Sequence, residues 1–257
     1  MRNPRLGPIL VIARSQAPFA LTLVGSLGLW QLTVALLRPP AYLLPGPLDV
    51  ARALADGRYQ WAQNLWVTLV EMTGGFALAA VGGCLLGILV VWSRLLEQTL
   101  LPLLVLINSI PKVAVAPLFL VWLGFGIVPN VVIVFFLTFF PIVMNTVTGL
   151  KTVDPELVDL ARSLSAPQWQ FFWKIRLPHA LPYIFSGLKI AATVAVIGAI
   201  IGEFIASEKG LGALIIAAQL SLATPAIFGA IALVSLLGVL LFRVVSLVER
   251  VAMPWER

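Results

Sequence analysis

PYIFSGLKIAATVAVIGAIIGEFIAS occupies residues 182–207, and its charged side chains are Lys189 and Glu203. A helix needs ~20 mostly apolar residues to cross a bilayer, so this stretch is long enough. The whole chain of 257 residues has a similar character, with 60% hydrophobic residues, 11% charged residues and a mean hydropathy of +1.03. Globular proteins carry ~25% charged residues. A soluble domain of this length could not bury so much apolar surface, so a bilayer must cover it.

The same length criterion predicts about six spans along the chain. They lie at residues 17–38, 62–92, 99–123, 128–149, 182–207 and 225–248. We therefore expect an all-α, polytopic membrane protein with one transmembrane domain over residues 1–257. The second span is too long for one perpendicular helix, and five glycines indicate close helix packing there. These glycines are Gly74, Gly75, Gly82, Gly83 and Gly87.

Three prolines, Pro102, Pro111 and Pro117, predict that the third span is broken. Breaks at membrane depth are tolerated where protein or a water-filled cavity satisfies the freed backbone groups. The segment is therefore either a wall of a transport pathway or a kinked packing helix. Both interpretations stay open at this point.

The distribution of basic residues predicts the orientation in the membrane. With the N-terminus inside, most Lys and Arg fall on the cytoplasmic side, and both chain ends are cytoplasmic. These residues are Arg2, Arg5, Arg14, Arg94, Lys151, Arg162, Lys174, Arg176, Lys189, Arg243, Arg250 and Arg257. The opposite side receives Arg38, Arg52, Arg58 and Lys209, and Lys112 stays in the membrane region.

Several classes of function are disfavoured by what the sequence lacks. The net charge of +6 is spread thinly without a basic run, which argues against nucleic-acid binding. No Walker-type Gly-rich sequence ending in Lys-Ser or Lys-Thr occurs, so a nucleotide site would belong to another polypeptide. His179 is the single histidine and Cys84 the single cysteine, so we expect no metal site. No catalytic cluster of His, Asp or Glu lies within the spans.

A polar loop, VDPELVDLARSLSAPQWQFFWKIRLPHALP at residues 153–182, separates the fourth and fifth spans. Asp154 and Pro155 suit a helix start, and Glu156 suits the positive end of the helix. Apolar residues recur after them at helical spacing, namely Leu157, Leu160, Ala161 and Leu164. Trp169, Phe172 and Trp173 would then share the face of a second short helix, and Leu177, Pro178 and Pro182 would end the excursion. A helix lying on the membrane surface has the same pattern.

These residues resemble the "EAA" signature of permease subunits of binding-protein-dependent ABC importers. That signature runs Glu-Ala-Ala, three residues, Gly, nine residues, Ile, one residue, Leu-Pro. This chain has Asp159-Leu160-Ala161, then Ser165, then Ile175 and Leu177-Pro178 at the same spacing. Ser165 is the main departure, because glycine enters a positive-φ turn more easily than serine does.

Three other segments resemble the sulfonate, nitrate, taurine and pyrimidine-precursor branch of that family. They are IPKVAVAPLFLVWLGFG at 110–126, FFPIVMNTVTGL at 139–150 and IGEFIASEKGLG at 201–212. The resemblance covers roughly residues 64–250 and implies a type I importer permease in a bacterial inner membrane. It also implies a coupling helix within the loop at 154–178 that docks on a separate ATPase. The implied coupling residues are Glu156, Leu157, Asp159, Leu160, Ala161, Arg162, Leu164 and Ser165.

Ionisable and polar groups inside spans are candidates for the pathway or its gate. These candidates are Asn108, Lys112, Asn145 and Glu203. Lys112 follows Pro111, where it could face the pathway or cap free carbonyls. Glu203 could lie on the pathway or pair with Lys209 at the surface. Glu71 could face a partner helix.

The resemblance implies an ATP-driven importer for a small organic solute. Two copies of the chain would form the pathway, each with an ATP-binding subunit that binds ATP and Mg²⁺, and an extracytoplasmic binding protein would deliver the solute. The segments at 193–204 and 151–164 are slightly closer to carriers of pyrimidine-type or aromatic compounds. The alternative function is a secondary transporter driven by an ion gradient, with the loop as a membrane-surface helix.

Overall fold

Every element of the computed structural model is a helix within residues 8–256, which are the residues that it describes. The side chains at 8–17, 19, 20, 206 and 256 are not described. The long helices are α1 (Pro8–Leu37), α3 (Trp61–Trp92), α6 (Ile127–Lys151), α9 (Leu177–Ala206) and α11 (Thr224–Ala252). The shorter α-helices are α2 (Pro47–Ala55), α4 (Arg94–Asn108), α5 (Lys112–Leu123), α7 (Pro155–Ser163), α8 (Gln168–Phe171) and α10 (Leu211–Leu220). Short η1 (Gly57–Tyr59), η2 (Phe172–Arg176) and η3 (Pro254–Glu256) complete the set, so the all-α class is confirmed.

Four of the six expected spans are single helices long and apolar enough to cross a membrane, namely α3, α6, α9 and α11. The expected third span is the pair α4 and α5, bent by 95°. The expected first span falls in α1, whose described apolar part is 21–37. Arg2, Arg5 and Arg257, which enter the orientation argument, lie outside the described residues, as does the side chain of Arg14.

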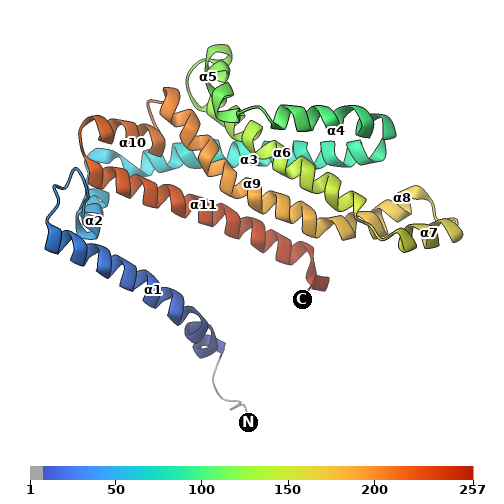
Figure 1. The fold of residues 1–257 in the computed structure, drawn as a ribbon, viewed down its shortest axis with the longest axis horizontal. Coiled ribbons are helices and arrows are strands. Elements are labelled where there is room, and N and C mark those ends of the chain that lie inside the picture. Colours follow the sequence, from blue (N-terminus) through green and yellow to red (C-terminus); the bar gives the residue numbers. More distant parts are fainter. Residues whose placement is uncertain (1–7, 257) are drawn as a thin grey trace, which may run out of the picture. The chain divides into compact units, whose positions relative to one another are not determined.

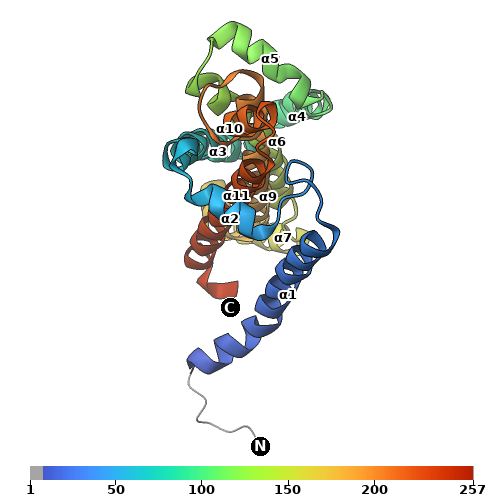
Figure 2. The same ribbon diagram turned by 90° about the vertical axis from the view of Figure 1, so that its left-hand side faces the viewer.

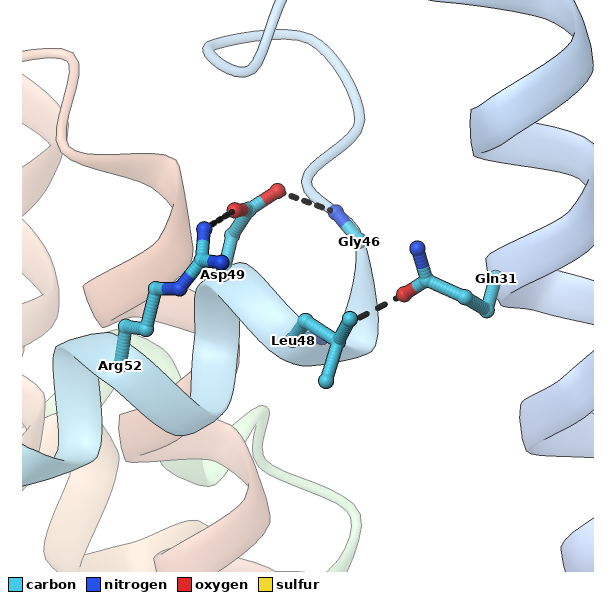
Figure 3. Close-up of polar contacts among 5 residues, drawn as sticks. All are labelled: Gln31, Gly46, Leu48, Asp49 and Arg52. Carbon is cyan, nitrogen blue, oxygen red and sulfur yellow. Dashed lines mark hydrogen bonds and ion pairs between the residues drawn. The ribbon is translucent and has the colours of Figure 1, made fainter.

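The chain forms two compact units. The first runs up to Tyr59 and includes 217–229, and the second comprises 60–216 and the chain from Ala230 onward. In the first unit, the Gln31 side chain of α1 accepts the Leu48 amide of α2 at 3.4 Å (Figure 3). Asp49 accepts the Gly46 amide at 3.2 Å and pairs with Arg52 (Figure 3). Thr224 donates to the Tyr42 carbonyl at 2.7 Å, which joins the two segments of this unit.

The core of the second unit is formed by α3, α6 and α9, which pack on one another. Figures 1 and 2 show α4 and α5 on one side of this core and the part of α11 in the second unit on the other. The close packing expected at the α3 glycines is confirmed at Gly75, Gly83 and Gly87. A Cβ atom at Gly75 would lie 2.5 Å from the Val134 Cβ, and one at Gly87 would lie 2.6 Å from the Thr146 Cγ2. Gly74 and Gly82 have more room, since their nearest neighbours lie 3.6 and 3.7 Å away.

The expected break in the third span occurs at Pro111, between α4 and α5. Pro111 is the N-cap of α5, a position that needs no amide hydrogen bond. Pro102 and Pro117 lie inside α4 and α5 without ending them. The sharp bend therefore lies at Pro111, where the helix is interrupted, and not at Pro102 or Pro117.

Candidate functional site

The helix expected in the polar loop is α7, and its start follows the sequence signals. The Asp154 side chain accepts the Glu156 amide at 2.9 Å, and Pro155 occupies the first helical turn. An N-cap of this kind contributes ~1 kcal/mol to a helix. Glu156 adds a negative charge in the first turn, and Arg162 a positive charge in the last. A nine-residue helix that protrudes from the core therefore has favourable ends.

The apolar face of α7 points away from the rest of the chain. Leu157, Leu160 and Leu164 are 41%, 55% and 71% exposed, while Ala161 is 9% exposed. Helical spacing places the three leucines in one stripe. Asp159 and Arg162 are also exposed and form an i,i+3 ion pair at 3.4 Å. The chain covers the Ala161 position itself and leaves the leucine stripe open.

Ser165 ends α7 in the conformation that the motif glycine would take. Its φ is +49°, and the Ser165 and Ala166 amides donate to the carbonyls of Arg162 and Ala161 at 2.9 and 3.0 Å. This is the Schellman arrangement, which normally has glycine in the left-handed position. The glycine-type corner is therefore kept although serine occupies it.

The second half of the loop differs from the sequence expectation. Helix resumes at Gln168 and continues through α8 and η2 into α9, so the excursion ends at Pro167 and not at Pro178. The reason is that η2 is a π-helical turn, in which the Leu177 amide donates to the Phe172 carbonyl five residues back. Such a turn accommodates the missing amide of Pro178 without ending the helix.

Aromatic side chains that were expected on one face of this segment are divided between the core and the surface. Trp169 and Trp173 are each 59% exposed. Phe172 is buried and packs edge-on against Trp92, with ring centroids 5.5 Å apart. The prediction that these three residues share one face was therefore wrong, because Phe172 points into the core with Leu150 while both tryptophans are exposed.

Two polar contacts tie the α7 end of the unit together. The His179 Nε2 lies 3.0 Å from the carbonyl of Thr152, the C-cap residue of α6. Lys151 pairs with Glu97 of α4 at 2.5 Å, with both side chains more than one third exposed. Figure 1 shows α7 and α8 at this end of α9 and α10 beyond its other end.

Lys112 and Asn108 meet across the bend between α4 and α5. The Lys112 Nζ donates to the Asn108 Oδ1 at 2.8 Å and to the Asn108 carbonyl at 3.2 Å. The ammonium group also lies 5.3 Å from the centre of the Phe140 ring. Lys112 thus caps the end of α4, which is one of the two roles considered from the sequence.

Asn145 makes a local contact on α6. Its side-chain amide donates to the Pro141 carbonyl, one turn earlier in the same helix, at 2.8 Å. On the other side, the Cβ of Asn145 lies against Gly187 of α9. The structure therefore places Asn145 between α6 and α9, apart from Lys112 and Asn108.

Glu203 is buried at 1% exposure, and among the described residues no ion pair joins it to Lys209. It accepts the Thr68 hydroxyl at 2.6 Å and the Gly212 amide, at the start of α10. The surface pairing considered from the sequence is therefore not seen. The candidates from the sequence do not form one cluster.

Two residues near Glu203 received no defined role from the sequence. Glu71 of α3 is also 1% exposed and accepts the Asn130 amide at 2.9 Å. Asn130 of α6 is fully buried and donates to the Ser207 hydroxyl at 2.7 Å. A carboxylate within an apolar span was the available signal for Glu71, whereas nothing local distinguishes Asn130 from other span residues.

Known proteins are similar in sequence to most of this chain. The family model described as "Binding-protein-dependent transport system inner membrane component" matches residues 79–252. The formylaminopyrimidine transport permease protein ThiX of Halalkalibacterium halodurans is 34% identical over 89% of this chain and 92% of its own length. The riboflavin transport system permease protein RibX of Chloroflexus aurantiacus is 39% identical over 91% of this chain and 88% of its own length.

The fold is also found in solved structures. An inward-facing crystal structure of the MetNI methionine ABC transporter contains a chain that matches 73% of this one and 94% of itself, with a TM-score of 0.59 and 22% identity. The formylaminopyrimidine relative lies in the branch expected from the sequence. By its sequence, over residues 79–252, this chain belongs to the inner membrane components of binding-protein-dependent transport systems.

Proposed function

We propose that this chain is the permease subunit of an ATP-driven importer and that α7 is the helix through which a separate ATP-binding subunit drives it. The open stripe of Leu157, Leu160 and Leu164 supports this proposal more than any other observation. Three adjacent leucines on a well-capped helix suit the groove of a protein partner. In this proposal, ATP and Mg²⁺ bind to the ATP-binding subunit and this chain needs no cofactor of its own.

The connections of α7 to α6 and α9 would let it transmit motion to these two helices. On one side three residues, Thr152 to Asp154, connect it to α6, and on the other side the continuous helix from Gln168 leads into α9. Because α6 and α9 pack on each other in the core, a shift of α7 would move both helices together. ATP binding and release on the partner subunit would then alternate access to a pathway between two copies of this chain. The α7 end and both chain termini face the cytoplasm.

A binding protein on the other side of the membrane delivers the solute, which we propose to be a small heterocyclic aromatic compound. The support is that two relatives at 34% and 39% identity are named for formylaminopyrimidine and riboflavin. Titration calorimetry of the partner binding protein with pyrimidines, flavins and aliphatic sulfonates tests this. Tight binding of a sulfonate and no heterocycle would contradict it.

The proposed coupling role of α7 is tested by co-purification of the solubilised chain with its ATP-binding subunit. Leu164→Glu places a charge in the leucine stripe without touching the core, and Leu160→Glu repeats the test one turn earlier. Leu222→Glu is the matched control, because Leu222 is 67% exposed and lies after α10. We expect the two α7 variants to lose the ATPase and solute-stimulated ATP turnover, and the control to keep both.

The alternative function gives the opposite result. In a secondary transporter with a membrane-surface helix, transport would continue without the ATPase and would follow an imposed ion gradient. If both α7 variants still bind the ATPase normally, α7 is not the helix through which that subunit acts. Ala161 is unsuitable for this test, because its carbonyl holds the end of α7 and its side chain is buried.

A further inference from the structure

Two carboxyl groups meet inside the second unit, far from α7. Glu71 of α3 and Glu203 of α9 are each 1% exposed. Thr68, one helical turn before Glu71, donates to Glu203 at 2.6 Å, and Asn130, which donates to Glu71, lies against Gly202 beside Glu203. Among residues 8–256, none of the ion pairs found includes either group. Two negative charges buried close together repel each other strongly, and two carboxylates without a proton have no donor between them.

The surroundings of Glu203 suit an ionised carboxylate. It accepts the Thr68 hydroxyl at 2.6 Å and the Gly212 amide, with the Ala213 amide as a further backbone neighbour. These amides belong to the first turn of α10, where the helix carries a positive partial charge. Donors that converge from two sides stabilise a negative charge.

The surroundings of Glu71 suit a neutral carboxyl group. Its Oε1 accepts the Asn130 amide at 2.9 Å, but its Oε2 is buried with no donor. Asn130 donates its other amide hydrogen to the Ser207 hydroxyl, and its Oδ1 packs against Gly202. A buried oxygen without a donor, next to a carboxylate that accepts hydrogen bonds, is the position that a proton would fill.

We infer that Glu71 and Glu203 form a buried proton-binding site, in which Glu71 Oε2 carries the proton and donates it to the ionised Glu203. This hydrogen bond closes the α9–α10 corner onto α3. It acts together with the Asn64 side chain, which accepts the Gly210 amide at 2.9 Å, and with Thr68, which accepts the Leu211 amide at 2.9 Å. The inference rests on this geometry and not on the proposed transport function.

Isosteric amides test which group holds the proton. In Glu71→Gln, the new N–H replaces the proton and the carbonyl still accepts from Asn130, so the thermal unfolding midpoint of the purified full chain should move by less than about 2 °C. In Glu203→Gln, the amide hydrogens face the Thr68 and Gly212 donors, so the midpoint should fall by about 5 °C or more. The midpoint of Glu71→Leu, which has no donor at this position, should fall by about as much as that of Glu203→Gln. Exposed Glu208→Gln is the matched control and should match the parent.

A second measurement keeps the inference testable if a variant does not fold. Infrared spectra of the parent chain should contain the carbonyl band of a neutral carboxyl group, and Glu71→Gln should lack it. The inference is overturned if Glu71→Gln loses as much stability as Glu203→Gln, or if the parent lacks that band. It is also overturned if the parent's midpoint rises with Na⁺ or K⁺ at constant ionic strength and Glu71→Gln abolishes this response, because a metal cation would then occupy the site.

Discussion

The two ends of α9 are held in different ways. At the α7 end, the contacts are partly exposed single interactions, the His179 contact with Thr152 and the Lys151–Glu97 pair. At the α10 end, beyond a helix of 30 residues or ~45 Å, buried Glu203 is held by Thr68 and the Gly212 amide. The first end presents apolar side chains outward, and the second encloses polar side chains.

The α7 end thus has the character of a docking surface, whereas the buried contacts at the α10 end anchor the fold. Exposed ion pairs contribute little to stability and rearrange easily, whereas buried polar groups cost free energy if they lose a partner. We therefore expect substitutions at the α10 end to change folding, and substitutions at the α7 end to change assembly with the partner subunit.

The largest effect is expected for Gly210→Ala at the α10 end. Gly210 has a φ of +116°, and a Cβ atom there would collide with the Glu203 carboxyl group. The strained backbone and the collision together should cost about 3 kcal/mol or more in the free energy of unfolding, measured in detergent with urea or heat. Gly57→Ala is the control, because no atom lies within 4 Å of a Cβ there. Equal stability of the two variants would contradict a tightly packed corner.

An intermediate effect is expected for Lys189→Met in the body of α9. Lys189 pairs with Glu249 of α11, and the two side chains are 28% and 20% exposed. Removing the ammonium group leaves a half-buried carboxylate without its partner, which should cost about 1–3 kcal/mol. Adding Glu249→Gln should recover part of this loss in the same unfolding experiment. If the double variant is no more stable than Lys189→Met, the pair has no electrostatic role.

A smaller effect is expected at the α7 end. Lys151→Met removes the pair with Glu97, whose side chains are 38% and 36% exposed. Solvent screens such a pair, so the free energy of unfolding should fall by no more than about 1 kcal/mol. A loss as large as that of Gly210→Ala would mean that both ends of α9 are anchors.

The smallest effect is expected at the corner after α7, and it is a gain. Ser165 adopts a left-handed backbone at a φ of +49°, a conformation that glycine takes without strain. Ser165→Gly should stabilise the chain by about 0.5–1 kcal/mol, because relief of strain exceeds the added freedom of the unfolded chain. Ser165→Val should be destabilising. Hydrogen exchange of the Ala166 amide gives the local readout, and faster exchange in Ser165→Gly would contradict the prediction.

Much of the fold follows from local sequence signals. Asp154 and Pro155 start α7 as expected, and Pro111 marks the bend between α4 and α5. Both features depend on a few neighbouring residues. The later part of the loop was not predictable in this way, because the π-helical turn at Phe172–Arg176 adds one residue to a helical turn. No periodicity of 3.6 residues contains that information.

The candidate site was predictable only in part for a similar reason. The spacing around Asp159 located α7, but Glu71 and Asn130 meet through packing between distant segments of the chain. Glu203 has an exposed lysine six residues later, so a surface pair was a reasonable alternative on sequence grounds. Only the packing of α3, α6 and α9 shows that Glu203 instead turns inward to Thr68.

The most direct test of the central claim is cross-linking from α7 to the ATP-binding subunit. In a Cys84→Ser background, Ser163→Cys puts the only thiol on exposed α7, and Glu208→Cys puts it at the other end of α9. A short thiol-to-amine cross-linker is applied to the assembled complex in membranes, and the products are analysed by mass spectrometry. We predict that the thiol at 163 joins the ATP-binding subunit and that the thiol at 208 does not. Cross-linking only at 208, or reaction of the thiol at 163 with lipid-phase reagents alone, would contradict the assignment of α7 as the coupling helix.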